Sequence, residues 1–123
     1  MYIKTQRLLI RNFKTDDLND VFDIYKDDET CKYLLHDAWN ENNKNQEFKL
    51  KLSKANLEKD HAVNLACVLD NVVIGDINIW YTQMKDSVEI GYTFNPKYSN
   101  NGYATEALKA VVEYQKTKKG IHR

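Results

Sequence analysis

The sequence predicts an α+β protein with a mixed sheet, in the element order β-α-α-β-β-β-α. Two observations carry this prediction. Residues 62–94 contain three β-rich runs separated by short polar turns, and apolar side chains recur at helical spacing over residues 15–26 and 103–118. No internal repeat, linker or low-complexity tract divides the 123 residues, so we expect a single domain over residues 1–123.

The N-terminal half is expected to begin with one strand and to continue with helices. Apolar and charged side chains alternate over residues 2–12, which predicts the strand. Thr15, followed by two aspartates, is typical of a helix start, with Thr15 as the cap and the helix ending near Lys26. A short helical turn is expected at residues 30–35, and a long, charged surface helix is expected from residue 40 or 41 to residue 59.

The middle of the chain predicts a hairpin and a third strand. Residues 62–69 and 72–81 are β-rich runs, and Asp70-Asn71 between them is a two-residue turn signal. Gly75, inside the second run, indicates a bulge or a close approach of the backbone to another group. A further turn leads into a strand that begins near Ser87.

The stretch from Asn95 to Ala107 joins this third strand to the last helix. Pro96 suits the end of a strand, and Asn100, Asn101 and Gly102 tolerate left-handed backbone and can cap a helix. Backbone N–H groups at a helix start point one way, at the positive end of the helix dipole, which favours a phosphate. An ordinary strand-to-helix turn with a plain cap explains the same residues equally well.

The charge and the cysteine content of the sequence argue against several classes of function. The chain has 18 basic and 18 acidic side chains and a sequence pI ≈ 6.8, so it lacks the basic footprint of a nucleic-acid binder. No apolar run reaches the length of a signal peptide or membrane segment, so we expect a cytoplasmic protein without a membrane partner. Cys31 and Cys67 form no C-x-x-C pair, and Cys67 is expected in the core. We therefore expect neither a metal site nor a cysteine mechanism.

Two motifs resemble the GNAT superfamily of N-acetyltransferases. The run P-K-Y-S-N-N-G-Y-A-T-E-A resembles its acetyl-CoA loop, R/Q-x-x-G-x-G/A; Gly102 and Ala104 match, whereas Ser99 replaces Arg or Gln and Asn100 replaces a common Gly. Together with E-I-G-Y at residues 89–92, it resembles the branch of the ribosomal-protein-alanine N-acetyltransferases. That branch also opens with a strand like T-Q-R-L-L-I-R at residues 5–11. The resemblance spans nearly the whole chain.

The resemblance implies a GNAT-like acyl-CoA N-acyltransferase fold and a function. An acetyl group would pass from acetyl-CoA, as co-substrate, to a primary amine on a protein N-terminus or a small molecule such as an amino sugar or polyamine. The pyrophosphate would bind the loop residues Ser99, Asn100, Asn101, Gly102, Tyr103, Ala104 and Thr105. The oxyanion would bind a backbone N–H of the preceding strand, near Tyr92, Thr93 or Phe94.

The resemblance also implies an acceptor site and suggests a base. In the family the segment between the first two helices shapes the acceptor site, which makes Tyr33, His36 and Trp39 candidates. Packing against the edge of the core explains such a Trp equally well. Glu89 is the candidate general base, because it shares strand parity with Gly91 and can face a cleft. A solvent-facing carboxylate is the competing explanation.

The chain departs from the family at its C-terminus. Members continue with a fifth strand that commonly starts like G-I-H-R at residues 120–123, followed by a helix and two strands. We therefore expect a C-terminally truncated fold with an uncovered strand edge, through which a homodimer could form. The alternative function is a non-catalytic remnant that binds CoA or another chain through that edge.

Overall fold

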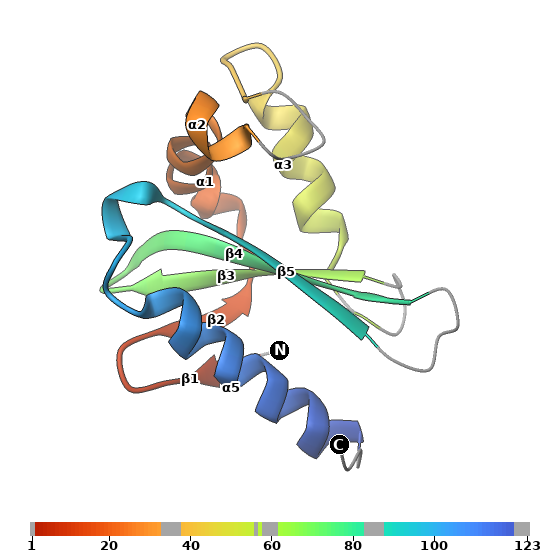
Figure 1. The fold of residues 1–123 in the computed structure, drawn as a ribbon. Helices are drawn as coiled ribbons and strands as arrows, with labels where there is room; N and C mark the ends of the chain where they lie inside the picture. The colour runs from red at the N-terminus through yellow and green to blue at the C-terminus, as the bar shows by residue number, and fades with distance from the viewer. Residues whose placement is uncertain (1, 33–37, 56, 58–61, 83–87, 120–123) are drawn as a thin grey trace.

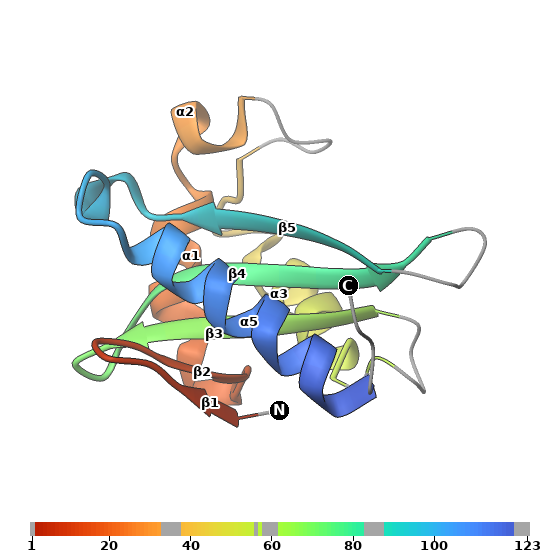
Figure 2. The same cartoon turned by 60° about the horizontal axis from the view of Figure 1, so that its bottom comes forward.

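The computed structural model describes residues 2–32, 38–55, 57, 62–82 and 88–119, which form a sheet with helices on both faces (Figure 1, Figure 2). The strands, in the sheet order β1-β2-β3-β4-β5, are β1 (Tyr2–Lys4), β2 (Leu9–Asn12), β3 (Ala62–Leu69), β4 (Val72–Tyr81) and β5 (Val88–Phe94). The helices are α1 (Leu18–Tyr25), α2 (Asp28–Cys31), α3 (Lys44–Ser53) and α5 (Tyr103–Lys119), with 3-10 turns η1 (Thr15–Asp17) and η2 (Pro96–Tyr98).

The α+β fold class is confirmed, but the described sheet is antiparallel throughout rather than mixed. Each strand pairs antiparallel with its neighbour, from β1 and β2 to β4 and β5. Parallel neighbours need a crossover connection, usually through one helix. Here the chain passes from β2 through α1 and α3 before it reaches β3, and it re-enters the sheet in the opposite direction.

The single strand predicted for residues 2–12 is instead a hairpin of β1 and β2. The chain turns at Thr5, whose backbone N–H donates to the Leu8 carbonyl at 2.9 Å. The Thr5 hydroxyl oxygen also accepts the Leu8 N–H at 2.9 Å. A threonine that satisfies nearby backbone groups in this way favours a turn over a continuous strand.

The first helix has its predicted range, because η1 leads directly into α1, which ends at Tyr25. The predicted cap is wrong: Asp17, not Thr15, binds the preceding backbone, and its carboxylate accepts the Lys14 N–H at 2.7 Å. The same carboxylate accepts two hydrogen bonds from Arg11, at 2.8 and 3.0 Å. The hydrogen bonding to Asp17 raises the pKa of the Arg11 guanidinium and ties β2 to the helix start.

α3 is shorter than the helix predicted for residues 40–59. Ahead of it, Asn40 Oδ1 accepts the Asn43 N–H at 3.0 Å, and Asn43 Oδ1 accepts the Asn40 N–H at 2.9 Å. At the other end, Lys54 leaves the helical region (φ −98°, ψ 72°), and its carbonyl accepts the N–H of Asn64 in β3 at 2.8 Å. Side-chain and sheet hydrogen bonds therefore replace helical ones at both ends.

The short turn predicted at residues 30–35 is described only in part. α2 ends at Cys31, and residues 33–35 lie outside the described residues. The prediction for the second cysteine is confirmed, because Cys67 is a fully buried free thiol in β3. Burial raises the pKa of the Cys67 thiol well above its usual range, which makes it a poor nucleophile.

The hairpin of β3 and β4 has the predicted strands and turn. Asp70 and Asn71 have positive φ angles of 48° and 69°, as a two-residue hairpin turn requires. The register shifts after Cys67, opposite Gly75, where β4 carries one extra residue. A Cβ at Gly75 would lie 2.5 Å from the ring of Phe94. The bulge and the close approach predicted at this glycine are therefore both present.

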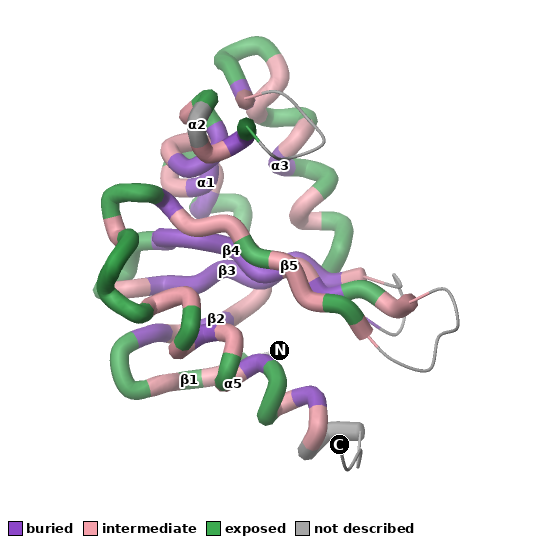
Figure 3. The backbone as a smooth tube through the Cα atoms, viewed as in Figure 1, coloured by how far each residue is buried: buried purple, intermediate pink, exposed green. Residues whose placement is uncertain are grey.

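The two faces of the sheet differ in polarity. The face under α5 is apolar and includes Leu65, Ile77 and, from the helix, Val111. The face under α1 and α3 combines a second apolar cluster with the polar side chains of Asp76 and Asn78 on β4. Figure 3 shows the buried residues concentrated along β3 and β4, whereas β5 is half-buried or exposed. The polar side chains that a reaction could involve therefore lie on the face of the sheet that packs against α1 and α3.

Candidate active site

The loop between β5 and α5 has the left-handed backbone that the sequence predicts. Asn100 and Gly102 have positive φ angles of 66° and 78°. The Asn101 side-chain amide donates to the Ser99 carbonyl at 3.0 Å, which holds the loop together. The residues from Ser99 to Gly102 are exposed, so a ligand can approach their backbone.

The first turn of α5 presents backbone N–H groups at this loop. The helix begins with a hydrogen bond from the Glu106 N–H to the Gly102 carbonyl, at 3.0 Å. The N–H groups of Tyr103, Ala104 and Thr105 precede that bond, so the helix itself does not pair them. They lie at the positive end of the helix dipole, where an anion is stabilised.

Arg7 and Glu106 join the β1–β2 turn to α5. Both lie in motifs quoted from the sequence, but those motifs do not indicate that the two residues meet. Glu106 accepts the Thr5 hydroxyl at 2.6 Å, the Arg7 backbone N–H at 2.8 Å and Arg7 Nε at 2.7 Å. These hydrogen bonds, first the one from Thr5, hold the pKa of Glu106 below its usual range. The Arg7 guanidinium lies 4.5 Å from the Tyr103 ring centroid and 3.5 Å from where a Gly102 Cβ would be. A cation therefore stands beside the loop.

α1 fixes the other end of the loop. Asp23 accepts the Asn95 side-chain amide at 2.9 Å and pairs with the Lys97 ammonium at 3.1 Å. The Asn95 side-chain oxygen in turn accepts the Lys97 N–H at 3.1 Å. Hydrogen bonding to Lys97 lowers the pKa of Asp23. The Lys97 ammonium is therefore directed to α1 and not to the first turn of α5.

β5 carries the candidate residues Tyr92, Thr93 and Phe94 at the edge of the described sheet. Thr93 pairs with Asp76 of β4, and Phe94 pairs with Gly75. Among the described residues, no strand pairs with the other side of β5. Tyr92 is 54% exposed, whereas Phe94 packs against the apolar core. The outer edge of β5 offers its backbone to an extended ligand, as an added strand would use it.

Glu89 lies on the face of β5 that its strand parity predicts. It is exposed and pairs with Trp80 in β4, and its Oε1 accepts the Trp80 indole N–H at 2.9 Å. Trp80 itself lines a cavity on this face, and Glu89 does not. The candidate base therefore lies at the border of that cavity, held there by the indole.

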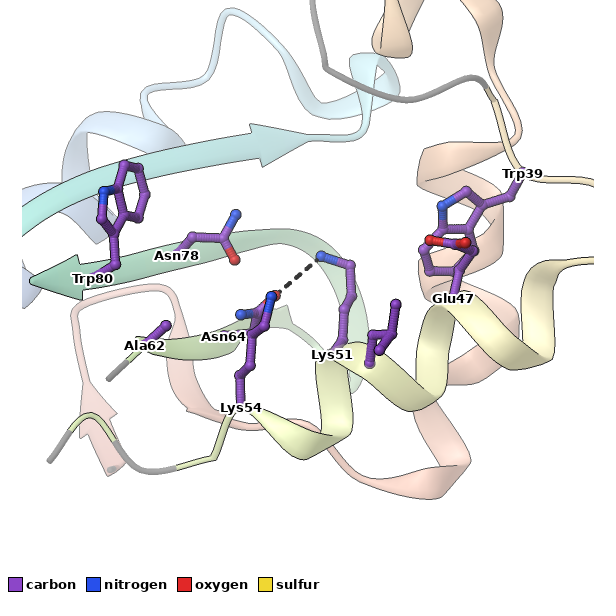
Figure 4. A pocket seen from close by; sticks show the side chains of 9 residues that line it. Trp39, Glu47, Lys51, Lys54, Ala62, Asn64, Asn78 and Trp80 are labelled. Atoms are coloured by element: carbon purple, nitrogen blue, oxygen red, sulfur yellow. Dashed lines mark hydrogen bonds between the residues drawn. The ribbon is translucent and has the colours of Figure 1, made fainter. Parts of the chain in front are cut away.

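The cavity measures about 370 Å³ and lies between α3 and the sheet (Figure 4). This volume is in the range of small-ligand pockets, roughly 300–1,000 Å³. Of the predicted acceptor-site residues, Trp39 lines the cavity, and Tyr33 and His36 lie outside the described residues. The helix side consists of Glu47, Leu50, Lys51 and Lys54, and the sheet side of Ala62, Asn64, Asn78 and Trp80.

A buried ionic network lies behind Lys51 and Asn64, which line the cavity. Asp76 is completely buried, and its Oδ2 accepts the Lys51 ammonium at 2.7 Å and the Tyr25 hydroxyl at 2.5 Å. Lys51 also donates to Asn64 Oδ1 at 3.3 Å. Burial raises the pKa of the Tyr25 hydroxyl well above its usual range, and the Asp76 carboxylate raises it further. The Tyr25 ring stacks on Trp39 at 4.9 Å between centroids.

Sequence reasoning missed this network, although one signal was present. Asp76 is the acidic residue within the β-rich run 72–81, where a charge is expected only with a partner. Its partners lie on α1 and α3, 51 and 25 positions away. No periodicity within one element identifies partners at such separations.

Three buried polar atoms near the cavity have no hydrogen-bond partner among the described residues. They are Trp39 Nε1, Asp76 Oδ1 and Asn78 Oδ1. Buried polar atoms are normally hydrogen-bonded. Trp39 and Asn78 line the cavity through other atoms, because the unpaired nitrogen and oxygen are themselves shielded from solvent.

The described residues contain no group of three His, Cys, Asp or Glu side chains arranged to hold a metal ion. None of their helices combines the length and apolar character needed to cross a membrane.

The fold is that of the acyl-CoA N-acyltransferase class. Among solved structures, an acetyltransferase (GNAT family) from Bacillus anthracis is similar at 31% identity and a TM-score of 0.84, over 99% of this chain and 70% of that chain. RimL, the ribosomal L7/L12 α-N-protein acetyltransferase, in complex with coenzyme A, has a TM-score of 0.75 at 13% identity, over 100% of this chain and 71% of that chain. At that identity the likeness to RimL shows the fold alone.

Sequence comparison gives the family. The family model "Acetyltransferase (GNAT) domain" matches residues 7–123. The chain is 33% identical over 128 residues to YnaD of Bacillus subtilis (strain 168), an uncharacterized N-acetyltransferase, with 100% of this chain and 70% of YnaD covered. The chain therefore belongs to the GNAT family of acetyltransferases.

Proposed function

We propose that this chain transfers the acetyl group of acetyl-CoA to a primary amine bound in the cavity under α3. The observation that carries the proposal is the position of β5. After β5 the chain passes through the loop to the start of α5, where the backbone N–H groups lie. The strand beside β5, β4, supplies Asn78 and Trp80 to the cavity. A donor site and an acceptor site can therefore meet along one strand. The acceptor is a small amine or a protein N-terminus, the latter being what RimL acetylates by its name.

The loop and the start of α5 form the donor side of the proposed site. The backbone N–H groups of Ser99–Thr105 hold the pyrophosphate, with Gly102 leaving room for its approach. The E-I-G-Y motif and the loop sequence support placing this chain in the branch of the ribosomal-protein-alanine N-acetyltransferases. Ser99 stands where that loop usually has Arg or Gln. When bound, acetyl-CoA supplies the activated acetyl group. A backbone N–H near Tyr92, Thr93 or Phe94 stabilises the charge that develops on the acetyl oxygen.

Glu89 serves as the general base in this proposal. An alkyl amine has a pKa near that of lysine, about 10.4, so it arrives protonated and must lose a proton before it can attack. Glu89 lies at the border of the cavity, and its carboxylate is oriented by Trp80. It therefore accepts the proton through a bridging water, as a group outside direct contact must.

CoA is expected to raise the thermal midpoint of unfolding. A ligand that binds only the folded protein stabilises it, by about 2.7 kcal/mol when its concentration is 100 times Kd. Differential scanning fluorimetry with a CoA titration measures the shift. The proposal fails if calorimetry shows no binding at millimolar CoA.

Gly102→Val is expected to weaken CoA binding on the order of tenfold or more. Its φ of 78° is unfavourable for valine, and the branched side chain would occupy the approach to the loop N–H groups. Lys97→Ala should change the affinity less, because that ammonium is paired with Asp23. Asn71→Val, at a φ of 69° in the β3–β4 turn, controls for backbone strain alone. Equal CoA affinities for Gly102→Val and Lys97→Ala would remove the loop from the site.

A further inference from the structure

The loop between β5 and α5, which the structure describes in full, lacks a cation of its own for the pyrophosphate. Ser99 stands where the resemblance places Arg or Gln, and a serine hydroxyl carries no charge. Lys97 is the basic residue within residues 95–105, and its ammonium pairs with Asp23 of α1 at 3.1 Å. The loop therefore offers an anion its backbone N–H groups, and a positive charge must come from another part of the chain.

The β1–β2 turn supplies such a charge through Arg7, which is held against the start of α5 (Figure 1). Arg7 Nε donates to Glu106 at 2.7 Å, and the Arg7 backbone N–H donates to the same carboxylate at 2.8 Å. The guanidinium carbon also lies 4.5 Å from the centroid of the Tyr103 ring. These contacts hold the guanidinium in place before any ligand binds, which reduces the conformational entropy that binding would cost.

The outer end of the Arg7 guanidinium is available to a ligand. Glu106 takes the N–H on Nε, and the N–H groups on Nη1 and Nη2 have no acceptor among the described residues. Nη2 lies 3.5 Å from where a Gly102 Cβ would be, and the Arg7 side chain is 42% exposed. The two terminal nitrogens of a guanidinium can donate in parallel to two oxygens of one phosphate. Arg7 therefore presents phosphate-binding groups beside the first N–H groups of α5.

Glu106 anchors Arg7 and does not occupy these terminal nitrogens. Its Oε2 accepts the Thr5 hydroxyl at 2.6 Å as well as the Arg7 backbone N–H, and its Oε1 accepts Arg7 Nε. Both carboxylate oxygens are therefore engaged by the β1–β2 turn. Because the carboxylate offsets part of the Arg7 charge, we expect Arg7 to act mainly through directed hydrogen bonds.

We propose that Arg7 binds the pyrophosphate of CoA and takes the place of the Arg or Gln that the loop lacks at Ser99. The inference rests on the proposed acetyl-CoA site. The backbone N–H groups at the start of α5 donate to the pyrophosphate, and Nη1 and Nη2 of Arg7 donate to it from the side of the β1–β2 turn. Bound CoA would then join the N-terminal hairpin to the loop, two parts of the chain that are far apart in the sequence.

Calorimetry of the full chain with two ligands tests this role. Arg7→Gln removes the charge and the paired terminal N–H groups, so it should weaken CoA binding on the order of tenfold, the usual effect of losing a hydrogen bond to a charged group. Arg7→Lys keeps the charge without the paired groups, and its affinity should lie between the two. Dephospho-CoA, which lacks the 3′-phosphate and keeps the pyrophosphate, should show the same losses. A loss seen with CoA but not with dephospho-CoA would refute the assignment to the pyrophosphate.

Two further variants separate ligand binding from a structural role of the Arg7–Glu106 pair. Glu106→Gln removes the other charge of the pair, and because that charge is negative, CoA should bind at least as tightly as it does to the parent. Lys4→Gln makes the same charge change as Arg7→Gln on an exposed residue of β1, and it should change the affinity little. Each variant is measured below its own thermal midpoint of unfolding, so that a loss of stability is not counted as a loss of affinity.

The outcomes distinguish this inference from the proposed function. If Arg7→Gln binds CoA as tightly as the parent, or if Glu106→Gln weakens binding as much as Arg7→Gln does, Arg7 is not a pyrophosphate ligand, and the proposed function is untouched. If the parent chain itself binds no CoA, the proposed donor site is wrong and this inference fails with it.

Discussion

Lys51→Met is expected to lower the free energy of unfolding by about 3–5 kcal/mol, the usual cost of removing one partner from a buried ion pair. Lys51 has a side chain only 12% exposed, and the Asp76 carboxylate that it contacts at 2.7 Å is completely buried. Without the ammonium, that carboxylate keeps the Tyr25 hydroxyl as its partner on Oδ2, and its Oδ1 has none among the described residues. Small domains are stable by about 5–15 kcal/mol, so this loss is a large fraction of the total.

Urea denaturation of a matched set of variants measures the effect. Lys49→Met makes the same substitution on the same helix at an exposed position, and a change within about 0.5 kcal/mol is expected. The double variant Lys51→Met/Asp76→Leu should be more stable than Lys51→Met alone, because it leaves no buried charge. If Lys51→Met costs under about 1 kcal/mol, or if the two losses simply add, the pair is not a coupled buried ion pair.

Glu89→Gln is expected to lower turnover at neutral pH on the order of 10²-fold while CoA affinity stays nearly unchanged. The substitution keeps the shape of the side chain and can keep the contact with Trp80, but it removes the proton affinity that a general base needs. Steady-state kinetics together with CoA calorimetry separate the loss of the chemical step from a loss of binding.

The pH dependence of turnover by Glu89→Gln tests more directly whether Glu89 is the general base. An amine that is already deprotonated no longer needs a base, so the gap between Glu89→Gln and the parent should close as the pH approaches the amine's pKa. An outward-facing carboxylate without a catalytic role predicts pH–rate profiles that run parallel. Parallel profiles would leave water, or the small neutral fraction of the amine, as the route for the proton.

The proposed donor and acceptor sites depend on different parts of the structure. The donor side is held by short-range loop contacts and by the Arg7–Glu106 pair, whose side chains are partly exposed at 42% and 18%. The acceptor side is held by the buried Lys51–Asp76 pair. We therefore expect Lys51→Met to disturb acceptor binding more than CoA binding.

Local patterns in the sequence predicted the elements whose conformation depends on near neighbours. The β3–β4 hairpin, with its turn at Asp70-Asn71 and its bulge at Gly75, follows from alternation and from residues that accept positive φ. The ranges of α1 and α5 and the left-handed backbone at Gly102 were predictable in the same way. Each of these features is determined within a few residues of itself.

The tertiary structure alone decided the features that join distant parts of the chain. The cavity lies where α3 ends at Ser53 and the Lys54 carbonyl accepts the Asn64 N–H, a contact that no helical periodicity encodes. The Tyr25–Asp76 and Arg7–Glu106 contacts bring together residues 51 and 99 positions apart. Propensity and spacing report on neighbours along the chain, whereas a charge is buried only where folding delivers its partner. The class of the protein was therefore readable from its sequence, but the chemistry of the acceptor site was not.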